Sequence, residues 1–399
     1  MARILLLCWR DDAHPQAGGS ERYLHQVGMH LAARGHTVFY RTSRPDGAAR
    51  AETSGGVRIS RGGGRFTVYP RALAAIVAAR SGRGPLAELG RADVVIDTQN
   101  GVPFFARLVS GAPGIVLVHH VHREQWPVAG RWTGRLGWWI ESWLAPRVHA
   151  HDQYVTVSIP SAEELASLGV DRERIAVIRN GLDPVPPGIP AGAPQEAMTA
   201  RSTATRDLGA RLVVLSRLVP HKHVEDTFTV LAALRENYPD LTLDVIGDGW
   251  WAGELRTAVR ERGLAGAVRF HGHVDEVRKH ELLSAAHVHL MPSRKEGWGL
   301  AVMEAAQHGV PTIGYHNAVG LRDSVVDGET GLLTRDIVGL TDATVRLLDE
   351  PDLRERLGAA ARERAAGFSW QSTGARMENL ITAVMRGERL SGEVDGTTG

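Results

Sequence analysis

The stretch VHLMPSRKEGWGLAVME, residues 288–304, contains the pattern that decides the fold. Residues 288–291 predict a short buried strand, and Gly297 and Gly299 allow the backbone to turn tightly after it. A helical pattern begins near Leu300. A buried strand followed by a glycine turn and a helix is the repeating unit of parallel sheets, so this stretch predicts an α/β fold.

Short apolar runs alternate with helical patterns along the rest of the chain, which predicts parallel sheets with helices on both faces. A helix is expected over residues 20–34, and Gly35 is placed to end it. A charged segment over residues 340–364 is expected to be helical and to lie at the surface. The expected strands are residues 4–8, 37–40, 93–97, 115–118, 154–157, 175–178, 212–215, 241–246, 268–271, 288–291 and 311–315.

Residues 183–206 interrupt this alternation with five prolines, which predicts a linker. We therefore predict two doubly wound, Rossmann-like α/β domains that face each other across a cleft. Ligands in such folds bind beyond the carboxyl ends of the strands, so the cleft is the expected site. The assigned parts are residues 1–183 and 207–366 for the two domains, 184–206 for the linker, and 367–399 for a helix that returns to the first domain and a disordered tail from residue 391.

The composition excludes several classes of protein. The 399 residues suffice for two or three domains, and 46 Lys and Arg residues nearly balance 45 Asp and Glu residues. The net charge of +1 argues against a nucleic-acid-binding surface but allows a local cationic pocket. The single cysteine, Cys8, excludes an intramolecular disulfide, and no apolar stretch approaches the roughly 18 residues of a transmembrane helix. We therefore expect a cytoplasmic protein.

Charged residues gather in loops of the second domain. Arg217 and Lys222 follow the expected strand 212–215, and a guanidinium fork beside an ammonium group suits a diphosphate. A solvated basic loop is the alternative. Glu296 and Glu304 are separated by seven residues around the glycine turn, where the amides of a helix start form an anion site. Glu296 could accept hydrogen bonds from sugar hydroxyls, and Glu304 from ribose hydroxyls. The alternatives are that the two carboxylates form a general acid–base pair or are surface charges.

Two further motifs lie in the first domain. Gly18 and Gly19 open the first helix and offer amides to a phosphate, although Ser20 is also a good ordinary N-cap. His119, His120 and His122 follow the expected strand 115–118, at the edge where ligands bind. Because no cysteine or carboxylate accompanies them in a zinc-like spacing, we predict no metal site here.

Taken together, these motifs resemble the retaining glycosyltransferases of family 4, which have the GT-B fold. The resemblance extends from about residue 4 to 333 and is most specific over residues 270–333, which contain FHGHV, the E-x7-E pair, a G-x-P strand and DGETGLL. The element Asn180-Gly181-Leu182-Asp183 matches the N-G-x-D element of the family. The first domain would then serve the acceptor and the second would bind a nucleotide sugar.

The resemblance also implies a role for each motif. Arg217 and Lys222 would bind the donor diphosphate, Glu304 the ribose and Glu296 the donor sugar. A histidine beside the donor sugar is best matched by His120, with His119 and His122 as alternatives. The remaining donor contacts would come from the amides of Gly299 and Leu300, from Gly18 and Gly19, and from the backbone near Val274 at the nucleobase. The family expects a small residue after Lys222, where this chain has His223.

The implied reaction moves a hexose-type sugar from a UDP- or GDP-sugar to a hydroxyl acceptor (a sugar, an aglycone or a lipid), with retention at the anomeric carbon. The chain contains no D-x-D triplet, so we expect neither a metal nor another cofactor to be required. Two alternatives stay open. One is a GT-B enzyme that hydrolyses or epimerises a nucleotide sugar. The other is a dinucleotide-dependent oxidoreductase, suggested by Gly247-Asp248-Gly249 but one residue too long for the usual fingerprint.

Five of the ten tryptophans fall between residues 126 and 143, with several arginines nearby. Helix packing is the favoured interpretation, because Trp139 and Trp143 are four residues apart on one helix face. A stacking platform for the acceptor is the second, and peripheral contact with an anionic membrane is the third. The sequence assigns no oligomeric state.

Overall fold

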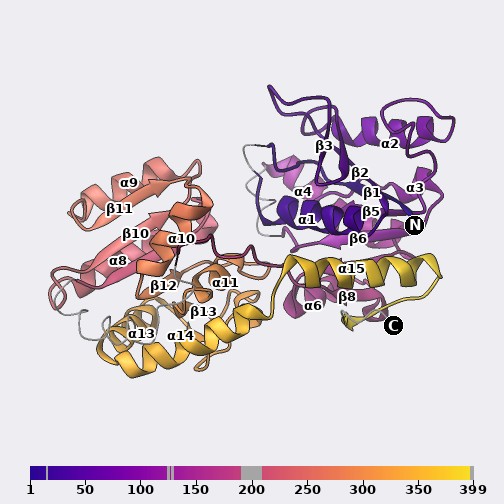
Figure 1. Cartoon of the computed structure of the whole chain (residues 1–399). Helices are drawn as coiled ribbons and strands as arrows, with labels where there is room; N and C mark the ends of the chain where they lie inside the picture. The colour runs from indigo at the N-terminus through magenta and orange to yellow at the C-terminus, as the bar shows by residue number, and fades with distance from the viewer. Residues whose placement is uncertain (15–16, 124–125, 127–129, 190–208, 396–399) are drawn as a thin grey trace. The chain divides into compact units, whose positions relative to one another are not determined.

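A computed structural model describes residues 1–14, 17–123, 126, 130–189 and 209–395. The chain divides into two compact units, each with its own largely or wholly parallel sheet (Figure 1). Unit 1 comprises Met1–Gly181 and Ser369–Gly399, and unit 2 comprises Leu182–Phe368. Most of the linker predicted at residues 184–206 lies outside the described residues.

Unit 1 contains a sheet with the strand order β15-β8-β7-β6-β5-β1-β2-β4-β3, in which β3 and β4 form the only antiparallel pair among the described residues. The central strands are buried on both faces, as their continuous apolar sequence requires. The strands are β1 (Arg3–Leu7), β2 (Thr37–Thr42), β3 (Ala51–Ser54), β4 (Val57–Arg61), β5 (Val94–Thr98), β6 (Gly114–Val118), β7 (Gln153–Thr156), β8 (Ile175–Val177) and β15 (Gly392–Glu393).

The C-terminal helix α15 (Trp370–Met385) packs against α1 (Gly19–Ala33) in unit 1 (Figure 1). Gly374 permits close contact, because a Cβ there would lie 2.3 Å from the His30 ring. Glu378 forms ion pairs with His30, Arg34 and His36. The other helices of the unit are α2 (Val68–Ala79), α3 (Arg107–Ser110), α4 (Arg131–Trp139), α5 (Ala145–Val148) and α6 (Ile159–Ser167), with a π-helical segment at Ile140–Leu144 and a 3-10 turn at Arg172–Arg174.

Unit 2 contains a wholly parallel sheet with the strand order β11-β10-β9-β12-β13-β14. The order reverses between β9 (Arg211–Leu215) and β12 (Val288–Met291), which creates a crevice beyond their carboxyl ends. The remaining elements are β10 (Thr242–Ile246), β11 (Val268–Gly272), β13 (Thr312–Tyr315), β14 (Gly331–Thr334), α8 (Glu225–Leu234), α9 (Ala252–Glu261), α10 (Glu276–Ala285), α11 (Leu300–Ala306), α12 (Leu321–Ser324), α13 (Ile337–Asp349) and α14 (Pro351–Ala366).

These observations confirm the predicted fold class of two doubly wound α/β units, and each expected strand overlaps an observed one. The prediction of a disordered tail from residue 391 was wrong at Gly392–Glu393, which pair with β8. The alternation of apolar runs and helical patterns in the sequence also failed to predict β3, β4, β14 and α2. Within the described residues, no helix is both long enough and apolar enough to cross a membrane.

Candidate active site

The loops that follow β9 and β12 meet in unit 2, where the strand order reverses. Lys222 lies in the first loop and Glu296 in the second, and Lys222 Nζ donates to Glu296 Oε1 at 2.5 Å. Only 13% and 10% of the two side chains are exposed, so the pair is largely withdrawn from water. Arg217 lies on the same loop as Lys222 and is exposed. The structure thus brings Lys222 and Glu296, predicted from separate motifs, into direct contact.

The shape of the loop explains the unusual residue after Lys222. His223 has φ of 47°, in the left-handed region that favours glycine, so a histidine occupies a backbone conformation that a glycine would adopt more readily. Burial, together with the charges of Lys222 and Arg217, lowers the pKa of His221 to about 4. His221 is therefore neutral at pH 7, and the permanent positive charge of this loop comes from Lys222 and Arg217.

The glycine turn before α11 is fixed by packing. Trp298 is buried, 4.9 Å from Phe368 between ring centroids, and anchors the loop between its two glycines. Gly299 has φ of 100° and precedes Leu300, the first residue of α11, as predicted. A Cβ at Gly320 would lie 2.2 Å from the carbonyl oxygen of Glu296, so only glycine allows this approach. The turn is therefore a rigid support for Glu296.

Glu304 lies on α11 and accepts a hydrogen bond from Lys279 Nζ of α10 at 2.6 Å. Lys279 also pairs with Glu276 at 2.8 Å. Burial raises the pKa of Glu304, and the positive charge of Lys279 opposes that rise. Lys279 was not predicted from the sequence, because its partner lies on a neighbouring helix 25 residues away. Val274, predicted near the nucleobase, lies between β11 and α10 and is partly buried.

In unit 1, the carboxylate of Glu21 lies beside the start of α1, where a phosphate was predicted to bind the amides of Gly18 and Gly19. This carboxylate is fully buried and accepts from the Gly18 amide at 2.9 Å and from Arg10 Nε at 3.0 Å. The Gly18 amide is therefore already satisfied within the chain. The alternative of Ser20 as N-cap was wrong, because Gly18 holds that position and α1 begins at Gly19.

The three histidines after β6 occupy different environments. His119 is buried edge-on against Tyr23, with ring centroids 5.2 Å apart, and burial lowers its pKa to about 3. His122 is bound by the buried carboxylate of Glu141, which accepts from its Nδ1 and its amide. The half-buried ring of His120 lies 4.3 Å from that of His122. Of the three, only His120 is neither buried nor described as bound to Glu141.

The tryptophan-rich segment contradicts part of the helix-packing interpretation. Trp138 packs against the core and Trp126 donates to Glu141 at 2.6 Å, as packing residues do. Trp139 and Trp143, on which that interpretation relied, are instead 46% and 44% exposed and stack on each other. Trp132 is 76% exposed.

The glycines of Gly247-Asp248-Gly249 are explained by packing within unit 2. A Cβ at Gly247 would lie 1.9 Å from the Ser216 carbonyl oxygen, and one at Gly249 would lie 2.1 Å from that of Leu218. The glycines therefore accommodate the loop after β9, and the dinucleotide interpretation loses its support.

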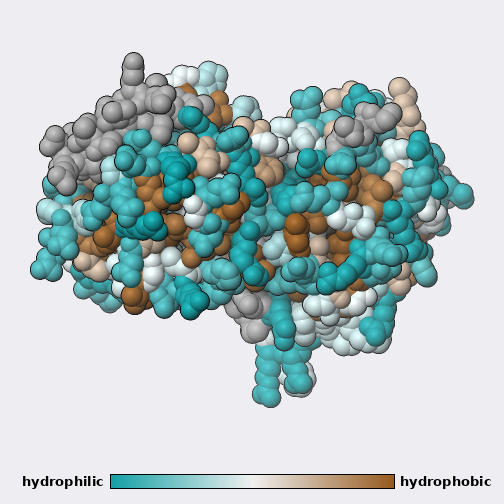
Figure 2. Space-filling view, turned by 90° about the horizontal axis from the view of Figure 1, so that it is seen from below, coloured by the Kyte–Doolittle hydropathy of each residue, from teal (hydrophilic) through white to brown (hydrophobic). Residues whose placement is uncertain are grey.

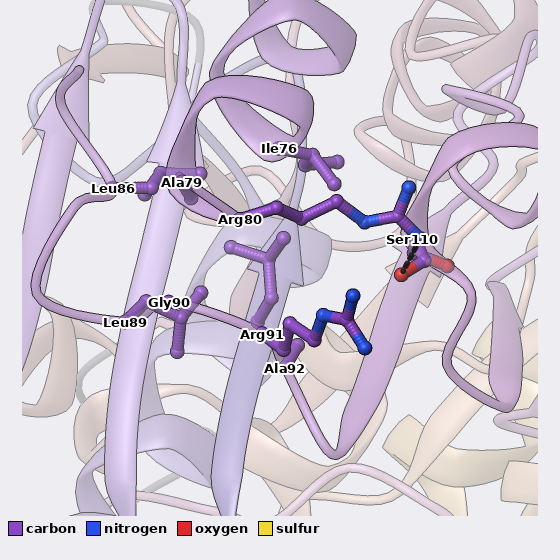
Figure 3. A pocket seen from close by; sticks show the side chains of 10 residues that line it. Ile76, Ala79, Arg80, Leu86, Leu89, Gly90, Arg91, Ala92 and Ser110 are labelled. Atoms are coloured by element: carbon purple, nitrogen blue, oxygen red, sulfur yellow. Dashed lines mark hydrogen bonds between the residues drawn. The ribbon is translucent and has the colours of Figure 1, made fainter. Parts of the chain in front are cut away.

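A small pocket in unit 1 lies apart from these residues. Its lining is largely apolar, and Arg80 crosses it to donate to the Ser110 carbonyl oxygen at 3.1 Å (Figure 3). None of the predicted site residues lines it, so we assign it no ligand.

Comparison with known proteins decides the family. The family described as "Glycosyltransferase Family 4" matches residues 17–185, and that described as "Glycosyl transferases group 1" matches residues 200–364. The glycogen synthase of Mycobacterium tuberculosis is 30% identical over 420 residues, covering 97% of this chain and 96% of that protein. The chain belongs to the family 4 glycosyltransferases.

Two further similarities agree with this assignment. A GDP-mannose-dependent α-(1-6)-phosphatidylinositol monomannoside mannosyltransferase of M. tuberculosis is 26% identical to this glycosyltransferase, covering 96% of this chain and 98% of its own. The structure of Anabaena HepE in complex with UDP and glucose superimposes with a TM-score of 0.71 at 17% identity, covering 96% of this chain and 100% of the other. The glycosyltransferase therefore has the GT-B fold.

Proposed function

We propose that this glycosyltransferase moves a hexose-type sugar from a UDP- or GDP-sugar to a hydroxyl acceptor, with retention at the anomeric carbon. The observation that carries the proposal is the contact between Lys222 and Glu296 beside the glycine turn of α11, at the strand reversal of a Rossmann-like sheet. One relative is named as GDP-mannose-dependent, and the similar structure of HepE contains UDP and glucose. Both support a nucleotide-sugar donor for this chain.

In this proposal, catalysis is mainly electrostatic. The nucleoside diphosphate leaves with developing negative charge, which Lys222, Arg217 and the amides of Gly299 and Leu300 stabilise. When Lys222 turns to the diphosphate, Glu296 is released to accept hydrogen bonds from the donor sugar.

The remaining contacts hold the donor in place. Glu304 accepts from the ribose hydroxyls, Val274 contributes its backbone to the nucleobase, and His120 lies beside the sugar. We assign no enzymic nucleophile, and no step requires a metal.

A titration tests the donor class. Calorimetry with UDP, GDP and NAD should show binding of one nucleoside diphosphate and none of NAD. A screen of nucleotide sugars should then show diphosphate release that depends on an acceptor. Equal release with water alone would favour the hydrolase alternative and contradict transfer.

We also propose peripheral membrane contact through an exposed helix face formed by Trp132, Leu136, Trp139 and Trp143. Trp132, Leu136 and Trp139 recur at intervals of four and three on α4, and Trp143, in the π-helical segment that follows, stacks on Trp139. Arg131, Arg135 and Arg147 are exposed around this face, and the one acidic residue of the segment 131–148, Glu141, is buried. Aromatic and cationic residues together suit an anionic lipid surface. On the side of the molecule that Figure 2 shows, hydrophobic and hydrophilic residues are intermingled.

The membrane contact is tested by flotation with vesicles of phosphatidylglycerol and phosphatidylcholine. The double variant Trp139→Ser/Trp143→Ser should bind about tenfold more weakly, since two exposed rings no longer insert. The matched control is Trp250→Ser, which removes a 66% exposed tryptophan from unit 2. Binding that is absent in the wild type, or equal in both variants, contradicts the proposal.

A further inference from the structure

Two buried arginines lie near the carboxyl ends of the neighbouring strands β2 and β4 in unit 1, on opposite faces of the sheet, and they are paired very differently. Arg61 of β4 binds Asp11 at 2.5 Å and Glu52 at 2.6 Å. Arg41 of β2 is only 4% exposed, yet no carboxylate among the described residues lies within ion-pair distance of it. Its Nη1 donates to Ser60 Oγ at 2.9 Å, and its buried Nε has no hydrogen-bond partner within the described part of the chain.

The guanidinium group of Arg41 lies against a glycine loop and near a second arginine. The loop Gly62-Gly63-Gly64 follows β4, and a Cβ at Gly62 would lie 2.6 Å from Arg41 Nη2, so the guanidinium group lies directly against the glycine backbone. The loop leads into the twelve-residue helix α2, whose first turn contains the exposed Arg71. Burial lowers the pKa of Arg41, and the charge of Arg71 lowers it further.

A buried cation without a counter-ion costs free energy, because the protein interior replaces its hydration poorly. The neighbouring Arg61 shows how this fold pairs a buried guanidinium group when the partner is internal. The counter-ion of Arg41 is therefore expected to be an anionic group of a bound ligand. Two guanidinium groups at the carboxyl edge of a parallel sheet match a phosphate group in charge.

We infer that Arg41 and Arg71 bind the phosphate monoester of a phosphorylated acceptor, so that the acceptor is a sugar or polyol phosphate. This inference rests on the proposed transferase function, and it assigns the acceptor class that the function leaves open. The subsite is formed entirely by unit 1 and is separate from the residues assigned to the donor diphosphate.

Steady-state kinetics test the subsite with a hexose phosphate and the corresponding neutral hexose as acceptors. The wild type should prefer the phosphate. Arg41→Met should raise the KM for the hexose phosphate at least tenfold and leave the KM for the donor unchanged. Arg58→Met is the matched control, because Arg58 lies on β4, the strand that pairs with β2, but is exposed and pairs with Glu88. It should behave as the wild type.

A second measurement does not depend on turnover. With saturating UDP present, inorganic phosphate should raise the Tm of the wild type in a saturable manner, and Arg41→Met should abolish this shift. If Arg41→Met does not fold, Arg71→Met at the exposed position provides the same comparison.

Three outcomes would overturn the inference: no preference for the hexose phosphate, an unchanged KM in both arginine variants, or a phosphate-dependent Tm shift that survives their substitution. Loss of vesicle binding in Arg41→Met without an effect on hexose phosphate would assign the site to a lipid headgroup instead. Failure of the proposed function itself would appear differently, as absence of nucleoside diphosphate binding in the wild type.

Discussion

The variant Lys222→Ala is expected to lower kcat about 10²- to 10³-fold, the usual effect of removing one preorganised group that stabilises charge in a transition state. Lys222 is mostly buried, so no solvent cation replaces it readily at the departing diphosphate. Stopped-time assays of nucleoside diphosphate release at saturating donor provide the measurement, and circular dichroism checks that the variant is folded.

The variant also leaves Glu296 without its partner, and a second variant separates the two effects. In Lys222→Ala/Glu296→Gln the unpaired carboxylate is gone, so stability should recover while the rate stays low. A folded Lys222→Ala enzyme that retains the wild-type kcat would contradict the assignment of Lys222 to the diphosphate.

The variant Glu304→Ala is expected to weaken nucleoside diphosphate binding about 10²-fold. A carboxylate that accepts from ribose hydroxyls makes charge-assisted hydrogen bonds, each worth about 1.5–3 kcal/mol. Calorimetric titration with the preferred nucleoside diphosphate measures the change in Kd.

The chain contains a matched control for this experiment. Lys279 binds both Glu304 and Glu276, but the side chain of Glu276 is 55% exposed. Glu276→Ala removes one carboxylate from the same lysine and should change the Kd less than about threefold, as expected of an exposed ion pair. Equal effects of the two variants would mean that Glu304 only supports Lys279.

The sequence predicted the strands well because most are buried on both faces, which leaves continuous apolar runs such as residues 115–118. It failed at β3 and β15, where that condition does not hold. β3 has the sequence AETS and is largely exposed, and β15 consists of Gly392 and Glu393 alone. Such strands are specified by their partners in the sheet rather than by their own residues.

The candidate site was predictable only in part. The positions of Lys222 and Glu296 after their strands placed both at one edge of the sheet, but their contact joins residues 74 apart and required the strand order. No sequence pattern indicated that the carboxylates of Glu21 and Glu141 are buried, because burial of a charge depends on tertiary contacts. The spacing of Trp139 and Trp143 predicted that they share a helix face, but it favoured packing and did not indicate that the face is exposed.

The most direct test of the account is the product of one reaction, followed by NMR with the preferred nucleotide sugar and the best acceptor from the screen. The account predicts one nucleoside diphosphate released for each sugar attached to an acceptor hydroxyl, with the anomeric configuration of the donor retained. Free sugar as the only product, or an inverted linkage, would contradict it.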